Sequence, residues 1–114
     1  MANTFINFGK ALTYNSGNGI LCYTCPAATI AIVLHLQVAN VDGTNSADVS
    51  VHWTDDNGTP ADTITRLCRT IPVPANTSLS VLTGKLVLEA GDTIVGVASA
   101  DGDLELSGSV LEMS

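Results

Sequence analysis

The sequence predicts an antiparallel β-sandwich, jelly-roll-like, with about eight strands. Apolar and polar residues alternate with a period of two through most of the 114-residue chain, which is typical of strands that bury one face. Clusters of Gly, Asn, Asp and Pro interrupt the alternation roughly every ten residues, as between short antiparallel strands. No segment of useful length shows apolar residues at helical spacing. The length suits a single domain.

The N-terminal segment, residues 1–19, is treated separately from the sandwich domain, residues 20–114. It is rich in turn-forming residues and carries a few apolar side chains in otherwise polar surroundings. Two interpretations stay open: an arm that docks on a neighbouring molecule, or an edge strand of the same sandwich. The apolar residues that would make such contacts are Phe5, Ile6 and Phe8.

The domain is expected to begin with a short strand at 20–25, followed by two long strands. The strand at 30–39 is predicted to bury its even-numbered residues and to turn Val33 and His35 outward. The strand at 47–54 is predicted to bury its odd-numbered residues, Trp53 included, and to turn His52 outward. An outward valine needs an apolar partner, so Val33 is a candidate contact residue.

These two long strands are predicted to form a hairpin around Asp42 and Gly43. Pairing Leu36 with Val51 keeps both apolar sets on one face of the hairpin. The same pairing places His35 opposite His52, where two imidazoles would bind a borderline metal or change charge with pH. Two ligands do not complete a metal site, so a polar surface or a contact between subunits is the favoured interpretation of this pair.

The C-terminal half is expected to supply the remaining strands. Their ranges are 64–71, 78–82, 85–89, 93–99 and 104–113. The turns between them are a corner at 72–76, a tight turn at 89–92 and a hairpin turn at 101–103. Within this half, Val95 is predicted to point outward and is another candidate contact residue.

The three cysteines are interpreted as reduced, packed thiols, because their number is odd and the N-terminus shows no secretion signal. Cys22 and Cys25 have the CxxC spacing, but an extended strand is expected to direct them to opposite faces. Cys68 alone cannot complete a metal site with them. We therefore expect neither a metal site nor a redox pair.

Charge excludes several classes of partner. The chain has 11 acidic and 4 basic residues, with a formal net charge of -7, so nucleic acid and anionic membranes are not expected to bind. No membrane span is expected either. The acidic loops at 55–62 and 101–105 offer oxygen ligands for calcium, but turn chemistry explains both. We expect no metal or cofactor.

Catalysis is not expected. The chain offers two histidines, two arginines and two lysines, and it lacks the GxSxG signature of a serine nucleophile. Charged residues make up only 13% of the chain, about half the usual share. A surface of uncharged polar residues suits a subunit that packs against neighbours.

Several strings of the sequence resemble small β-sandwich virion structural proteins of tailed bacteriophages. They are YTCPAA at 23–28, VANVDG at 38–43, DVSV at 48–51, IPVPA at 71–75, GKLVLEAGD at 84–92 and SGSVLEM at 107–113. The resemblance covers most of residues 20–114, whereas Cys22 and the region 53–69 match less well.

The resemblance implies a structural β-domain of the virus particle, without catalytic residues. With the low-charge surface, it leads us to expect a head decoration, or cement, protein that binds the outside of the capsid and stabilises it. The implied partners are the major capsid protein and further copies of the chain, as a trimer, and the implied location is the virion, assembled in the host cytoplasm. An accessory protein of the tail, neck or fibre is the first alternative. A carbohydrate-binding or host-adhesion module is the second, and exposed aromatic side chains would indicate it.

Overall fold

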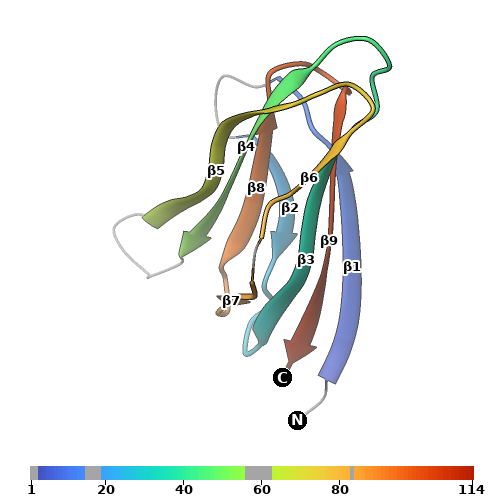
Figure 1. The fold of residues 1–114 in the computed structure, drawn as a ribbon. Coiled ribbons are helices and arrows are strands. Elements are labelled where there is room, and N and C mark those ends of the chain that lie inside the picture. Colours follow the sequence, from blue (N-terminus) through green and yellow to red (C-terminus); the bar gives the residue numbers. More distant parts are fainter. Residues whose placement is uncertain (1–2, 15–18, 56–62, 83) are drawn as a thin grey trace.

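Two antiparallel β-sheets face each other in the computed structural model of the chain, which describes residues 3–14, 19–55, 63–82 and 84–114 (Figure 1). Every regular element in these described ranges is a strand, so the predicted all-β sandwich is confirmed. The strands are β1 (Asn3–Ala11), β2 (Ile20–Thr24), β3 (Ile30–Asn40), β4 (Ala47–Asp55), β5 (Thr63–Val73), β6 (Ser78–Ser80), β7 (Leu86–Leu88), β8 (Thr93–Ala98) and β9 (Leu104–Met113).

The strand order is that of a jelly roll. The five-stranded sheet has the order β1-β9-β3-β6, with β7 also paired to β3, and the four-stranded sheet has the order β2-β8-β4-β5. β6 and β7 pair with different halves of β3, around Val38 and Ile32, and together replace one strand of the fold. Each strand expected from the sequence is present. The N-terminal segment forms an edge strand, since β1 pairs with β9 along its whole length.

The core lies between the two sheets. The largest of its fully buried side chains are Leu12, Leu36, Leu88, Ile94, Leu104 and Leu106. On the side of β1 and β2, the rings of Phe8 and Tyr23 stack with their centroids 5.4 Å apart. The Tyr23 hydroxyl donates a hydrogen bond to the Glu112 carboxylate. Throughout the described ranges, no buried side-chain nitrogen or oxygen lacks a hydrogen-bond partner, as expected of a native interior.

The inward face of β3 changes along the strand, which corrects one prediction. A bulge between Val33 and His35 inserts one residue into the pairing with β9. An extra residue shifts the period-two alternation by one, so Val33 is buried before the bulge and Leu36 after it. The prediction is right for Leu36 and Val38. It is wrong for Val33, which lies in the core, and for three residues that lie on the outer face, Ile30, Ile32 and Leu34.

The predicted hairpin of β3 with β4 is also wrong, because the two strands belong to different sheets. The apolar sets meet across the core instead of along a shared edge. Buried Asn40 holds the connection: its amide donates to the carbonyls of Asn45 at 3.0 Å and Val73 at 2.8 Å, and its side-chain oxygen accepts the Asp42 N–H at 2.8 Å. Residues 101–103 likewise connect the two sheets, from β8 to β9, and do not close a hairpin.

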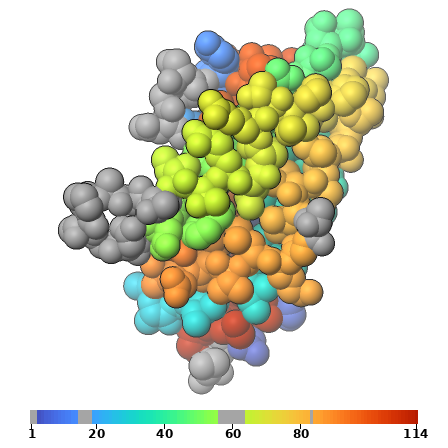
Figure 2. All heavy atoms as spheres, turned by 60° about the vertical axis from the view of Figure 1, so that its left-hand side comes forward, coloured from blue at the N-terminus to red at the C-terminus, as the bar shows by residue number. Residues whose placement is uncertain are grey.

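Two other turns have the predicted positions, and each connects the two sheets. At 89–92 the Asp92 N–H donates to the Glu89 carbonyl at 3.0 Å, with Gly91 at a φ of 88°. At the corner after β5, the Thr77 N–H donates to the Pro74 carbonyl at 3.2 Å. In the space-filling view the chain from β5 through β6, yellow to orange, runs over one side of the molecule (Figure 2).

Candidate functional site

The apolar residues predicted as contacts in the N-terminal strand do not share one surface. The register of β1 places Ile6 and Phe8 opposite buried residues of β9, on the core side of the sheet. Phe5 lies opposite Leu111 on the outer face, and 75% of it is exposed. Phe8 therefore belongs to the core of its own chain, where it stacks on Tyr23. Ile6 keeps 36% of its surface exposed, so of the three residues Phe5 is the most exposed and Phe8 is the one packed against the core.

The two histidines lie on different sheets, so the predicted histidine pair does not form. His35 is exposed on β3, whereas His52 is half-buried on β4, opposite Val95. Burial, and then the charge of Arg66, lowers the pKa of His52. Val95 lies on the outer side of its sheet, as predicted, but is only 8% exposed because the backbone at Gly19 packs against it.

The three thiols are free and shielded from solvent to different degrees. Burial raises the pKa of Cys22 to about 11 and also raises the pKa of Cys25 and of Cys68. Cys22 and Cys25 both lie in the core, so the expectation of opposite faces is wrong: a pairing irregularity between Leu21 and Tyr23 changes the alternation of β2. Thiols with raised pKa values are poor nucleophiles at neutral pH.

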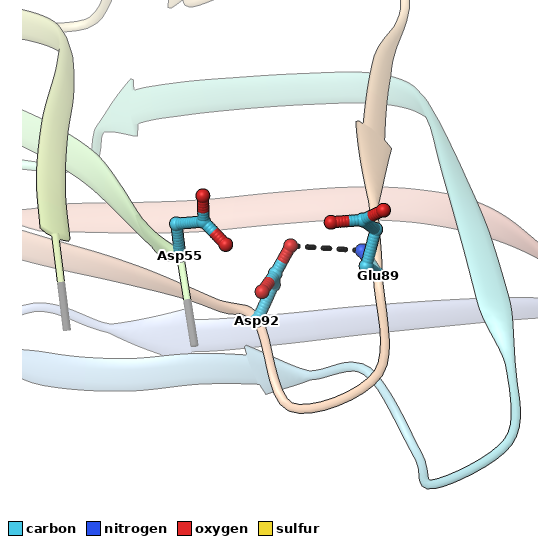
Figure 3. A group of neighbouring side chains, drawn as sticks. All are labelled: Asp55, Glu89 and Asp92. Atoms are coloured by element: carbon cyan, nitrogen blue, oxygen red, sulfur yellow. Dashed lines mark hydrogen bonds between the residues drawn. The ribbon is translucent and has the colours of Figure 1, made fainter. Parts of the chain in front are cut away.

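Three carboxylates converge where β4 ends beside the turn from β7 to β8 (Figure 3). Asp55, Glu89 and Asp92 each place one oxygen within 4.8 Å of the other two. Asp92 is 2% exposed, and its Oδ2 accepts the backbone N–H of Glu89 at 2.8 Å. Carboxylates are calcium ligands. The buried position of Asp92 is nevertheless explained without a metal, because the turn needs a hydrogen-bond acceptor for the Glu89 N–H.

These three carboxylates do not form either of the two acidic loops, 55–62 and 101–105, that the sequence offers as calcium sites. The trio combines Asp55 from one acidic loop with two residues of a distant turn, and only the pairing of β4 with β8 joins them. The rest of the first loop, residues 56–62, lies outside the described residues. In the second loop, Asp101 accepts the Tyr14 N–H at 2.6 Å. Asp103 instead lies beside Asp42, and its pKa is raised by partial desolvation and then by that neighbouring charge.

Replacing Asp92 by alanine is expected to destabilise the fold by about 1–3 kcal/mol, because the Glu89 N–H loses its acceptor inside the turn. Urea-induced unfolding, followed by the fluorescence of Trp53, measures the difference. Glu89→Ala is the matched control, since it removes a carboxylate of the same cluster and leaves the backbone N–H in place. Equal stability of the two variants would contradict the role of Asp92 in the turn.

A shallow depression of about 200 Å³ lies beside Tyr14. Tyr14 is 65% exposed. Polar residues of β4 and β5 line the depression with it, together with Ser99 and the apolar side chains of Val97 and Ala98. Two of their hydroxyls already serve the backbone: Ser99 Oγ accepts the Asp48 N–H at 2.8 Å and Ser50 Oγ accepts the Thr70 N–H at 2.9 Å. The depression thus combines one exposed ring with hydroxyls that have structural roles.

Comparison with known proteins adds no further constraint on the site. No family model matches the chain, and no curated protein matches it in sequence. Over the described ranges, the structure contains no helix long and apolar enough to cross a membrane.

Proposed function

We propose that this chain is a structural protein of a tailed-phage virion, and specifically a decoration protein that binds the outer surface of the capsid and stabilises it. The observation that carries the proposal is the jelly-roll order of the strands, taken together with the resemblance of the sequence strings to phage virion proteins. The cysteines are free thiols with raised pKa values, and the histidines lie on separate sheets. The thiols are therefore poor nucleophiles at neutral pH, and the two imidazoles do not meet at one site.

The fold supports the same proposal by analogy. Jelly rolls occur in viral capsid domains and in lectin domains, and a fold alone does not determine function. The resemblance of the sequence strings to phage virion proteins favours the capsid among these uses. The acidic net charge of -7 favours protein partners, the major capsid protein and other copies of this chain, over nucleic acid or an anionic membrane.

Two alternatives differ in their partner. An accessory protein of the tail, neck or fibre would have the same fold and the same chemistry. A carbohydrate-binding module is favoured by one observation, the exposed ring of Tyr14 beside a shallow depression, because sugars stack on such rings. We place it second because the hydroxyls of Ser50 and Ser99 are engaged by the backbone.

Purified virions test the proposal directly. We expect quantitative mass spectrometry to find hundreds of copies per particle and antibody labelling to place them on the head. Particles produced without the protein are expected to release their DNA at a lower temperature, and purified protein added back is expected to restore the wild-type temperature. The readout is the temperature at which the particles release their DNA. The same particles, measured before the protein is added, are the control.

Each outcome has a definite meaning. A few to a few dozen copies on the tail would reassign the protein to the neck, tail or fibre. Absence from purified particles would overturn the virion proposal altogether. Head labelling without any effect of add-back would retain the location and reject the stabilising role.

A further inference from the structure

We propose that the outer face of the five-stranded sheet binds the same face of a second copy of this chain, giving a two-fold dimer. The first observation is a row of apolar residues that crosses the whole sheet. Phe5 of β1 pairs with Leu111 of β9, Leu111 pairs with Ile32 of β3, and Ile32 pairs with Val87 of β7. Residues paired in this way are direct neighbours on one face of a sheet.

Much of this row is open to solvent. Phe5 is 75% exposed and Val87 is 54% exposed. Ile30, the next residue of β3 on this face, is 48% exposed. Leu34, at the bulge, is 39% exposed. Together they form a contiguous patch on the order of a few hundred Å², the size at which apolar patches on monomers mark interaction sites.

The second observation is the near absence of charge from this face. Of the described residues that alternate onto it, Glu105 is the one that carries a carboxylate, and it lies beside Ala39, far along β3 from the apolar row. Lys85, just before β7, is the basic residue beside this face, where it lines a depression with Leu34 and His35. The other polar residues of the face are His35 and the uncharged side chains of Asn3, Asn7, Gln37, Ser78, Ser80, Ser107 and Ser109.

This distribution of charge favours a second copy of the chain as the partner that binds this face. Two chains that each carry a net charge of -7 repel each other over most of their surfaces. A face with few charges keeps the like charges of the two copies apart, and burying its apolar row removes no ion from water. The outer face of the four-stranded sheet is different, because Asp48 and Arg66 lie on it.

The geometry suits a closed pair. The molecule measures 47 × 31 × 20 Å, so its large faces can supply the roughly 800 Å² per partner that a stable interface buries. Sheets pack face to face with their strands nearly aligned, and a two-fold axis parallel to the strands would set Phe5 against Val87 of the other copy. Such an isologous contact closes at two copies, in place of the trimer expected from the sequence.

Sedimentation equilibrium of the full chain tests the proposal at concentrations from about 1 to 500 µM. We expect the wild-type protein to approach twice the monomer mass of 11.7 kDa. Val87→Glu, on an exposed side chain, is expected to weaken dimerisation at least tenfold, because it buries two new charges against an apolar surface. Phe5→Glu is expected to act in the same direction.

Leu21→Glu is the matched control. Leu21 is 54% exposed on the four-stranded sheet, so the variant adds the same charge to the chain and leaves the proposed face unchanged. Circular dichroism melts confirm that each variant is folded. A monomeric wild type at the highest concentration, a trimer, or equal dissociation constants for Val87→Glu and Leu21→Glu would each overturn the proposal. The virion measurement does not depend on this result, so the two proposals fail separately.

Discussion

Gly108→Ala is expected to destabilise the protein by about 3 kcal/mol, at the upper end of what overpacking of a core costs. A β-carbon at Gly108 would lie 2.6 Å from the ring of Phe8 and 2.8 Å from the backbone carbonyl of His35. The ring can move, but the carbonyl belongs to β3 at the bulge and cannot withdraw without breaking its pairing with β9. Displacing Phe8 also disturbs its stack on Tyr23.

Thermal unfolding measures this effect, with an expected fall in the melting temperature of roughly 10–15 °C for a domain of this size. Gly9→Ala is the matched control, because Gly9 also lies in a strand of the same sheet and a β-carbon there would have its nearest neighbour at 3.8 Å, an ordinary contact. That variant is expected to match the wild type or to gain slightly, since alanine restricts the unfolded chain. If Gly108→Ala had the same melting temperature as Gly9→Ala, β3 and β9 would not be in the contact described.

Gly108 also explains why the alternation of β3 predicts the wrong inward face for its first half. The strand is apolar at both parities from Ile30 to Leu34, so a period-two pattern cannot decide which set faces the core. The choice is made by the bulge, and the bulge lies next to Gly108 of a strand far along the chain. A glycine inside a strand can mark a bulge or a close approach, but the sequence alone does not say which partner strand is affected.

The pairing of strands is the second feature of the fold that cannot be predicted from the sequence pattern. The existence of each strand and most of its bounds follow from local alternation and turn residues, which act over a few neighbours. Whether β3 and β4 share an edge or face each other across the core depends on the packing of the whole chain. An apolar face on each strand satisfies both arrangements equally well, so the alternation predicts the burial of Leu36 and Val51 correctly and their hairpin incorrectly.

The candidate surface is predictable only in part, for the same reason. Phe5 stands out because it is aromatic in a polar segment, but Ile32 and Val87 look like ordinary core residues of apolar strings. They become neighbours of Phe5 on the outer face only through the register of four strands. The acidic trio that includes Asp92 is not predicted by the sequence, because Asp55 ends β4 and the other two members belong to a distant turn.

Stability is expected to fall steeply between pH 9 and pH 11. Burial raises the pKa of Cys22 from its ordinary value of 9.0 to about 11, and it also raises the pKa of Cys25, Cys68 and Tyr23. The unfolded chain loses the thiol protons around pH 9 and the Tyr23 proton around pH 10, whereas the folded chain releases them at higher pH. The folded state then binds more protons, so the free energy of unfolding decreases as pH rises.

Cys22 alone accounts for a loss on the order of 2 kcal/mol across this window, since each pKa unit corresponds to about 1.4 kcal/mol and some solvent reaches the sulfur. The contribution is fully present below pH 9 and disappears as the pH passes about 11. Urea-induced unfolding in the presence of a reducing agent, at intervals from pH 7 to 11, measures the slope. Below pH 9 we expect these four groups to leave the free energy of unfolding independent of pH.

Cys22→Ala separates the thiol from the other groups. The substitution leaves a small cavity and lowers stability at every pH, so the informative quantity is the slope between pH 9 and 11, which is expected to become shallower than in the wild type. The phenol of Tyr23 continues to contribute in this variant, because its hydrogen bond to the Glu112 carboxylate requires the proton. Equal slopes for the two proteins would show that Cys22 is as accessible to hydroxide in the folded chain as in the unfolded one.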